Sequence, residues 1–149
     1  MFEIKRTDSD NLAFQKLVIE LDKDLAIRDG DEHAFFDQYN KISAIKYVVL
    51  AYENNMAVAC GAIKEYDKNT MEIKRMYVSV AKREQGIASI LLKELEKWAA
   101  QLGYKKCILE TGIKQPEAIN LYKKNNYDSI PNYGQYAQVA SSICFEKII

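Results

Sequence analysis

The hydrophobic and polar residues of the chain follow two periods, one typical of strands and one typical of helices. Alternating or continuously apolar segments predict strands at residues 2–6, 47–52, 57–66, 71–80, 106–110 and 141–147. Apolar residues three and four positions apart predict a helix after Ser9 or Asp10, a short helix over 34–39, a long one over 86–102 and another from Pro116 to Asn125–Asn126. This order predicts an α/β (α+β) fold, with helices on both faces of a mixed, mostly antiparallel sheet of six to seven strands.

The clearest helix is predicted over residues 86–102. Its apolar stripe is formed by Ile87, Leu91, Leu95, Trp98 and Leu102. Its polar residues, Glu96 among them, are expected to face away from the core, and Gly103 is the expected left-handed stop. Because strand 71–80 precedes this helix and the buried strand 106–110 follows it, the three form a central βαβ unit with parallel strands.

The alternation within residues 71–80 changes phase in the middle of the strand. Apolar residues occupy odd positions before Lys74 and even positions after Arg75. A regular strand cannot move its side chains to the other face midway, so one extra residue, a β-bulge, is predicted there. The alternative is a surface strand with imperfect alternation.

Length and composition agree with one domain over residues 1–149. A chain of 149 residues with 48% hydrophobic residues suits a single core, and no repeat or linker divides it. The 21 basic and 21 acidic residues cancel, which argues against nucleic-acid binding and against a polybasic membrane anchor. The longest apolar run, residues 47–52, is far shorter than the ~20 residues of a membrane-spanning helix.

The cysteines and the histidine suggest neither a disulfide framework nor a metal site. Cys60, Cys107 and Cys144 are widely separated and lie in apolar stretches, as expected of buried, reduced thiols in the cytoplasm. His33 is the single histidine, so no Cys/His cluster is available for a structural metal, and we expect none.

The loop between strand 71–80 and the long helix has the composition of an anion site. A helix start leaves about four backbone N–H groups unpaired and has a partial positive charge. Gly86 and Ala88 remove side-chain bulk there, and Lys82 and Arg83 add positive charge, which suits a pyrophosphate. The alternative is a plain helix start with small residues for packing.

Two motifs in this part of the chain resemble those of the GNAT superfamily of N-acetyltransferases. Residues 83–88 match its signature of arginine or glutamine, two variable residues, glycine, one variable residue, and glycine or alanine. Residues 115–127, which include Leu121–Tyr122, resemble the motif that follows it. The chain departs from the usual pattern at Ala88, where many members have glycine, at Gln115, which replaces asparagine, and at Asn126, which replaces glycine.

The resemblance implies a GNAT-like fold and acetyl-CoA as the cosubstrate. In the family the loop binds the pyrophosphate, and a bulge separates two parallel strands so that the pantetheine arm enters between them. The phase slip predicts such a bulge independently. The residues expected to bind the cofactor are Met76, Tyr77, Val78, Arg83, Glu84, Gln85, Gly86, Ile87, Ala88 and Ser89.

Two residues are predicted to move protons during acetyl transfer. Tyr122 stands where many family members have a tyrosine near the thioester sulfur, and its phenol can donate to the departing thiolate; the alternative is a core aromatic residue. Glu72 is the candidate base for the amine, by its spacing to Gly86; the alternative is an outward-facing charge that pairs with Lys74 or Arg75. Glu110 is a second candidate base or an inert charge at a strand end.

The acceptor site is the least defined part of the prediction. Acidic residues crowd residues 22–40, and Asp31, Glu32 and His33 are candidate acceptor contacts; the alternative is a set of solvated helix caps. The segment Asn132–Tyr136 is either a rim over the acceptor pocket or a hairpin loop. We expect an N-acetyltransferase that acts on a small-molecule amine, as a monomer or homodimer, without nucleic-acid or membrane partners. The alternatives are a protein acetyltransferase and a non-catalytic acyl-CoA sensor.

Overall fold

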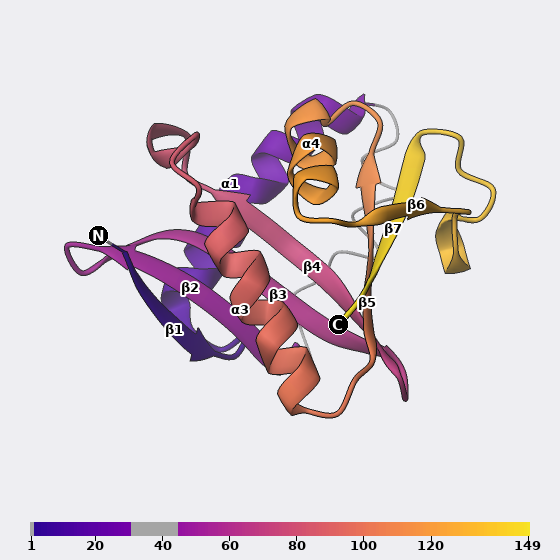
Figure 1. The fold of residues 1–149 in the computed structure, drawn as a ribbon. Coiled ribbons are helices and arrows are strands. Elements are labelled where there is room, and N and C mark those ends of the chain that lie inside the picture. Colours follow the sequence, from indigo (N-terminus) through magenta and orange to yellow (C-terminus); the bar gives the residue numbers. More distant parts are fainter. Residues whose placement is uncertain (1, 31–44) are drawn as a thin grey trace.

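The computed structural model describes residues 2–30 and 45–149, which form one seven-stranded sheet with helices on both faces (Figure 1). The strands are β1 (Glu3–Thr7), β2 (Tyr47–Glu53), β3 (Met56–Asp67), β4 (Thr70–Val78), β5 (Lys106–Gly112), β6 (Asp128–Ile130) and β7 (Ser142–Ile148). The helices are α1 (Leu12–Asp29), α3 (Ile87–Gln101) and α4 (Pro116–Lys124), with the short 3₁₀ helices η2 (Val80–Lys82) and η3 (Gly134–Tyr136). The helix predicted over 34–39 lies outside the described residues.

The strand order confirms the predicted fold class. The order across the sheet is β1-β2-β3-β4-β5-β7-β6, and β4 and β5 are its parallel pair. The other neighbouring strands in this order are antiparallel. Helix α3 connects β4 to β5, so the predicted βαβ unit is present at the centre of the sheet.

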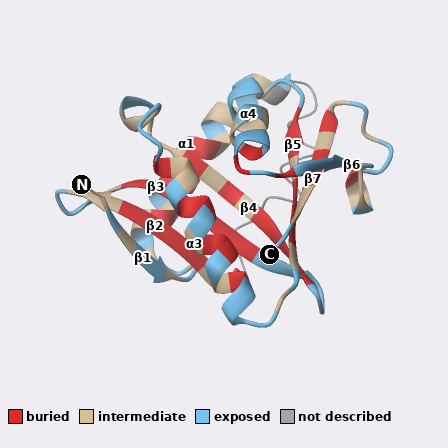
Figure 2. Ribbon diagram, viewed as in Figure 1, coloured by how far each residue is buried: buried red, intermediate tan, exposed pale blue. Residues whose placement is uncertain are grey.

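Two hydrophobic layers enclose the sheet. On one face, residues of α3 such as Leu91 and Leu95 pack with Tyr122 of α4 against the central strands. On the other face, Phe14 and Leu17 of α1 pack against β2 and β3. Figure 2 shows the buried residues concentrated along the central strands and on the side of α3 that faces the sheet.

The sequence misplaces the start of α1. Ser9 or Asp10 is predicted as the cap, whereas the Asn11 side chain accepts the hydrogen bond from the Phe14 N–H at 3.0 Å. Leu12, at the first position of the helix, is 72% exposed. Asparagine and aspartate are similarly good caps, so residue type alone does not choose between neighbouring positions.

Helix α3 has the predicted ends but not the predicted polar face. Gly86 precedes it with φ 80°, and Gly103 follows it with φ 95°, both in the left-handed region that favours glycine. Glu96 is buried rather than facing away, because it accepts hydrogen bonds from the Tyr127 hydroxyl and the Lys147 ammonium, each at 2.9 Å.

The predicted β-bulge in β4 is present. Cys60 of β3 lies opposite Tyr77, and Ala62 lies opposite Lys74, so Gly61 alone faces the two residues Arg75 and Met76. Arg75 has φ 58°, as expected for an inserted residue that turns the chain. A Cβ atom on Gly61 would lie 2.9 Å from the Leu95 Cδ1 atom and closer still to the Met76 sulfur. Glycine therefore lets β3 pass close beneath the bulge.

Candidate active site

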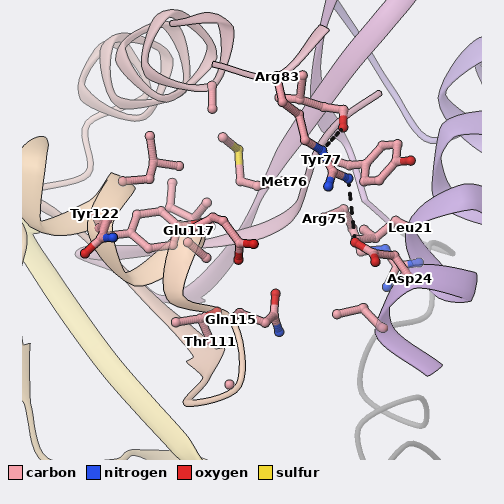
Figure 3. A pocket seen from close by; sticks show the side chains of 18 of the residues that line it. Leu21, Asp24, Arg75, Met76, Tyr77, Arg83, Thr111, Gln115, Glu117 and Tyr122 are labelled. Carbon is pink, nitrogen blue, oxygen red and sulfur yellow. Dashed lines mark hydrogen bonds and ion pairs between the residues drawn. The ribbon is translucent and has the colours of Figure 1, made fainter. Parts of the chain in front are cut away.

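The parallel strands β4 and β5 separate beyond their first three pairs. Their register runs from Thr70 and Lys106 to Glu72 and Ile108 and then stops, while β5 continues its pairing with β7 on its other edge. A pocket of about 660 Å³ lies at this separation, and β4, β5, α1, α3 and α4 all contribute to its lining. In Figure 3, Tyr122 and Glu117 lie on one side of the pocket and Leu21 and Asp24 on the other, with Met76 between them.

The bulge leaves part of the β4 backbone directed toward the pocket. The Ser79 N–H donates to the Val58 oxygen of β3 at 2.8 Å. Successive N–H groups of a strand point to opposite edges, so the Val78 N–H points away from β3, toward the gap. The Val78 oxygen accepts a hydrogen bond from Arg83 Nε at 2.9 Å, which agrees with this orientation. Of the predicted cofactor residues Tyr77 and Val78, Val78 is therefore the one whose N–H is directed toward the gap.

The beginning of α3 forms one end of the pocket. Gly86 has no side-chain capping hydrogen bond, and the first turn contains no acidic residue. The positive end of the helix dipole and the first-turn N–H groups therefore suit an anionic ligand. The predicted cofactor residues at this end that line the pocket are Arg83, Glu84, Gly86, Ile87, Ala88 and Ser89; Gln85 is exposed and is not among the lining residues.

The Arg83 side chain is held over β4 by contacts within the chain. Its Nε donates to the Val78 oxygen, and its Nη2 lies 3.6 Å from Asp24 Oδ2 of α1 (Figure 3). Its guanidinium also lies over the Tyr77 ring, 5.5 Å from the centroid. The arginine thus sits between the helix start and the exposed backbone of β4.

Tyr122 lines the pocket from α4 and is 5% exposed. Burial raises the pKa of its phenol well above the ordinary value of ~10, and the negative charge of Glu110 adds to this shift. The ring belongs to the hydrophobic layer that contains α3, so the predicted acid is also a core aromatic residue. Both interpretations of Tyr122 agree with its position.

The candidate base Glu72 lies on the opposite face of the sheet. It lines the pocket, is 8% exposed, and accepts a hydrogen bond from the Tyr133 hydroxyl at 2.5 Å. Its Oε1 atom is 3.7 Å from the Lys74 ammonium, and burial lowers the pKa of Lys74. The alternative pairing with Lys74 is therefore present, but the carboxylate is buried in the pocket rather than facing outward.

Glu110 also lines the pocket on this face. It is half-buried, and its Oε2 accepts a hydrogen bond from the Ser142 hydroxyl at 2.6 Å, so it remains either a second candidate base or a charge near the strand end that pairs with Ser142. Its pairing with Cys144 places it on the side of the sheet where Tyr133 and Tyr136 pack. Glu72 and Glu110 thus both line the pocket on this face of the sheet.

The structure describes some of the remaining predicted acceptor contacts and not others. Asp31, Glu32 and His33 lie outside the described residues. In the segment Asn132–Tyr136, the η3 residue Tyr136 lines the pocket, so this segment contributes to its wall.

Sequence reasoning misses Arg28 and Lys74 as pocket residues. Arg28 Nη1 donates to Glu117 Oε2 at 2.8 Å, which links the end of α1 to the start of α4 across the pocket. Arg28 and Glu117 are 89 positions apart in the sequence, so no local pattern connects them.

The described residues were also compared with the requirements of a metal site and of a membrane-spanning helix. Within 2–30 and 45–149, no group of three or more histidine, cysteine, aspartate or glutamate side chains is arranged to hold a metal ion. Among the helices of this described part, none is both long enough and apolar enough to cross a membrane.

Comparison with known proteins identifies similar sequences and folds. The model of the acetyltransferase (GNAT) family matches residues 14–127. An "IAA acetyltransferase" of Azospirillum brasilense is 28% identical over 137 residues, which cover 91% of this chain and 90% of the relative.

Two crystal structures have closely similar folds. A Klebsiella pneumoniae protein assigned to the acyl-CoA N-acyltransferases is 27% identical, with a TM-score of 0.83 over 99% of this chain and 97% of that one. A GNAT family acetyltransferase of Elizabethkingia anophelis, determined with acetyl-CoA bound, is 22% identical, with a TM-score of 0.72 over 99% of this chain and 98% of that one.

Proposed function

Because the chain belongs to the GNAT family of acetyltransferases, we propose that it transfers the acetyl group of acetyl-CoA to the primary amine of a small molecule. The amine attacks the thioester directly while both substrates are bound. The observation that supports this most strongly is the pocket between β4 and β5, which extends from the start of α3 to the buried Tyr122 and Glu72.

The donor fits this pocket by charge and by shape. The pyrophosphate would lie at the start of α3, against the first-turn N–H groups and close to Arg83. The pantetheine arm would follow the backbone of β4, where pairing with β5 has ended. The family neighbour with bound acetyl-CoA supports this choice of cosubstrate.

Acetyl transfer needs three contributions from the protein. The Val78 N–H would stabilise the oxyanion that forms on the thioester carbonyl, as the neighbouring hydrogen bonds of β4 favour. Glu72 would accept the proton of the amine, directly or through water. Tyr122 would donate to the sulfur as the carbon–sulfur bond breaks.

Tyr122 and Glu72 lie on opposite faces of the sheet, on either side of the gap. Tyr122 belongs to the layer that contains α3 and α4. Lys74 lies opposite Ala62, which packs against α1, so Lys74 and its neighbour Glu72 two positions earlier point to the α1 face. An amine that enters from the α1 face therefore meets a thioester whose sulfur lies toward Tyr122. This arrangement suits attack from one side and departure of the thiolate toward the other.

The state of the cysteines supports one proposed compartment. The three cysteines are all free and buried, which supports the proposal that the protein works in the reducing cytoplasm.

The experiment that tests the proposed function is a screen of primary amines with acetyl-CoA. Release of coenzyme A is followed with a thiol reagent, products are identified by mass spectrometry, and donor binding is measured separately by calorimetry. We expect at least one small amine to gain an acetyl group. Donor binding without turnover on any amine would indicate an acyl-CoA sensor, and acetylation of peptides alone would indicate a protein acetyltransferase.

A further inference from the structure

The segment between β6 and β7 returns to the centre of the sheet at Tyr133. Its hydroxyl donates to Glu72 Oε2 at 2.5 Å, although the two residues are 61 positions apart in the sequence. A hydrogen bond to a charged carboxylate is stronger than one between neutral groups, especially where burial excludes water. The bond therefore restricts the rotation of the carboxylate that the proposed function uses as a base.

The two oxygens of Glu72 have different surroundings. Oε2 is bound by Tyr133, whereas Oε1 lies 3.7 Å from the Lys74 ammonium. That longer contact is weaker than a hydrogen bond of normal length, so Oε1 is the oxygen that a proton from an acceptor or a water can reach more readily. The charged and titratable groups near Glu72 on the described elements are Lys64 on β3, Lys74 on β4, Glu110 on β5, Tyr133, Tyr136 and Cys144.

Tyr133 is itself held firmly. Its ring packs edge-on against Tyr66 and Tyr136, with centroids 5.3 and 5.9 Å away. The adjacent Asn132 donates to the Val139 and Ser142 oxygens, both at 3.0 Å, which fixes the segment before β7. Burial, and next the charge of Glu72, raises the pKa of the Tyr133 phenol, so it stays protonated and can only act as the donor in this pair.

We infer that Tyr133 is a positioning residue, which holds Glu72 by Oε2 and leaves Oε1 to accept the proton of the attacking amine. This inference rests on the proposed function, because it assigns Glu72 a role as the base. Tyr133 does not touch the reacting atoms in this scheme. It acts through the rotamer of Glu72, which its hydrogen bond restricts.

The test replaces Tyr133 by phenylalanine, which removes the hydroxyl and keeps the ring contacts. We expect kcat to fall roughly tenfold, as for loss of a hydrogen bond to a charged group. We also expect the KM of the amine to change little, because Tyr133 does not touch the acceptor in this scheme and the loss therefore falls on kcat. The affinity for acetyl-CoA, measured by calorimetry, stays the same because Tyr133 is not among the residues that line the pocket.

Two controls separate positioning from a merely structural role. Tyr66→Phe removes a hydroxyl from the neighbouring ring, which has no bond to Glu72, and leaves both kcat and the KM of the amine unchanged. In a Glu72→Gln background, Tyr133→Phe lowers kcat no further. A further roughly tenfold fall in kcat in that background, or an unchanged kcat in Tyr133→Phe, overturns the inference.

A double-mutant cycle of unfolding free energies tests the contact between Tyr133 and Glu72 without any measurement of turnover. Urea unfolding of the wild type, the two single variants and the double variant gives the coupling between Tyr133 and Glu72. Additive effects would show that the two side chains do not interact in solution and would overturn the inference. A wild-type protein that binds acetyl-CoA but acetylates no amine counts instead against the proposed function.

Discussion

Tyr122 illustrates how one residue can serve both the core and the chemistry. Its ring contacts Tyr127 and Phe145, with centroids 5.6 and 6.1 Å away, so the fold fixes the position of the hydroxyl. Burial raises the pKa of the phenol, which keeps it protonated throughout the neutral range. A free thiol ionises near ~8.5, so the departing thiolate gains from a donor that is always in its acid form.

We therefore predict that Tyr122→Phe reduces kcat by about a hundredfold, a typical contribution of acid catalysis, and leaves the dissociation constant of acetyl-CoA almost unchanged. Steady-state kinetics and calorimetry measure the two quantities. The matched control is Tyr127→Phe, which removes a buried hydroxyl that bonds to Glu96. That change lowers stability by about 1–3 kcal/mol without a comparable loss of kcat. Normal turnover of Tyr122→Phe at every pH would remove the acid role.

At the scale of the elements, the start of α3 and the bulge in β4 together form the proposed donor site. Both are predicted from local patterns, the first by small residues before a helical stripe and the second by a change in the phase of alternation. Such patterns depend on neighbours within a few positions, so a sequence reveals them. The burial of Glu96 is different, because Tyr127 and Lys147 cover it from other elements.

Reversing the charge at the start of α3 tests the anion site. Arg83→Glu places a carboxylate beside the phosphates and opposite Asp24, so we expect the affinity for acetyl-CoA to fall at least about tenfold. The matched control is Lys97→Glu, which makes the same charge change at an exposed position of α3 outside the pocket and leaves the affinity unchanged. Calorimetry at two salt concentrations provides the measurement. Equal affinities of the wild type and Arg83→Glu would exclude this contact.

A glycine-to-alanine pair tests the bulge. In Gly61→Ala the new methyl group meets Met76 and Leu95, so the strand must shift, at a cost of about 1–3 kcal/mol. Since Met76 lies in the bulge, we also expect weaker binding of acetyl-CoA. Gly103→Ala meets no neighbouring atom and only strains the left-handed φ, which costs about 1–2 kcal/mol without an effect on binding. Urea unfolding measures the stability of both variants, and calorimetry measures their affinity for acetyl-CoA. An unchanged affinity in Gly61→Ala would show that the bulge does not contribute to the proposed donor site.

At the scale of the whole molecule, the contacts on the proposed acceptor side are the part of the site that one sequence does not predict. Glu72 is a candidate from its spacing to Gly86, yet its partner Tyr133 comes from the other end of the chain. Arg28 and Glu117 likewise meet only after α1 and α4 have docked on the sheet. Long-range contacts of this kind depend on the packing of complete elements, and one sequence without relatives gives no signal for them.

The packed sheet also buries three thiols, and this makes the stability of the molecule depend on pH. Burial raises the pKa of Cys60 and Cys107 to about 12 and that of Cys144 to about 11. In the unfolded chain the same thiols ionise near ~8.5. The unfolded state therefore loses protons first as the pH rises, so the thiol contribution to stability is complete below that value and declines above it.

We accordingly predict that the free energy of unfolding falls as the pH rises from about 8.5 toward the folded-state pKa values of about 11 and about 12, by up to about 1.4 kcal/mol per pH unit for each thiol. Urea unfolding at several pH values measures the decline. Cys60→Ala lowers the free energy of unfolding at neutral pH. It also removes one of the three buried thiols, so the fall in that free energy at alkaline pH becomes smaller by the contribution of that thiol. Iodoacetamide at about pH 8 should leave the native protein unmodified and alkylate all three cysteines in urea. A pH-independent stability, or rapid alkylation of the native protein, would mean that the sheet does not protect these thiols as its packing indicates.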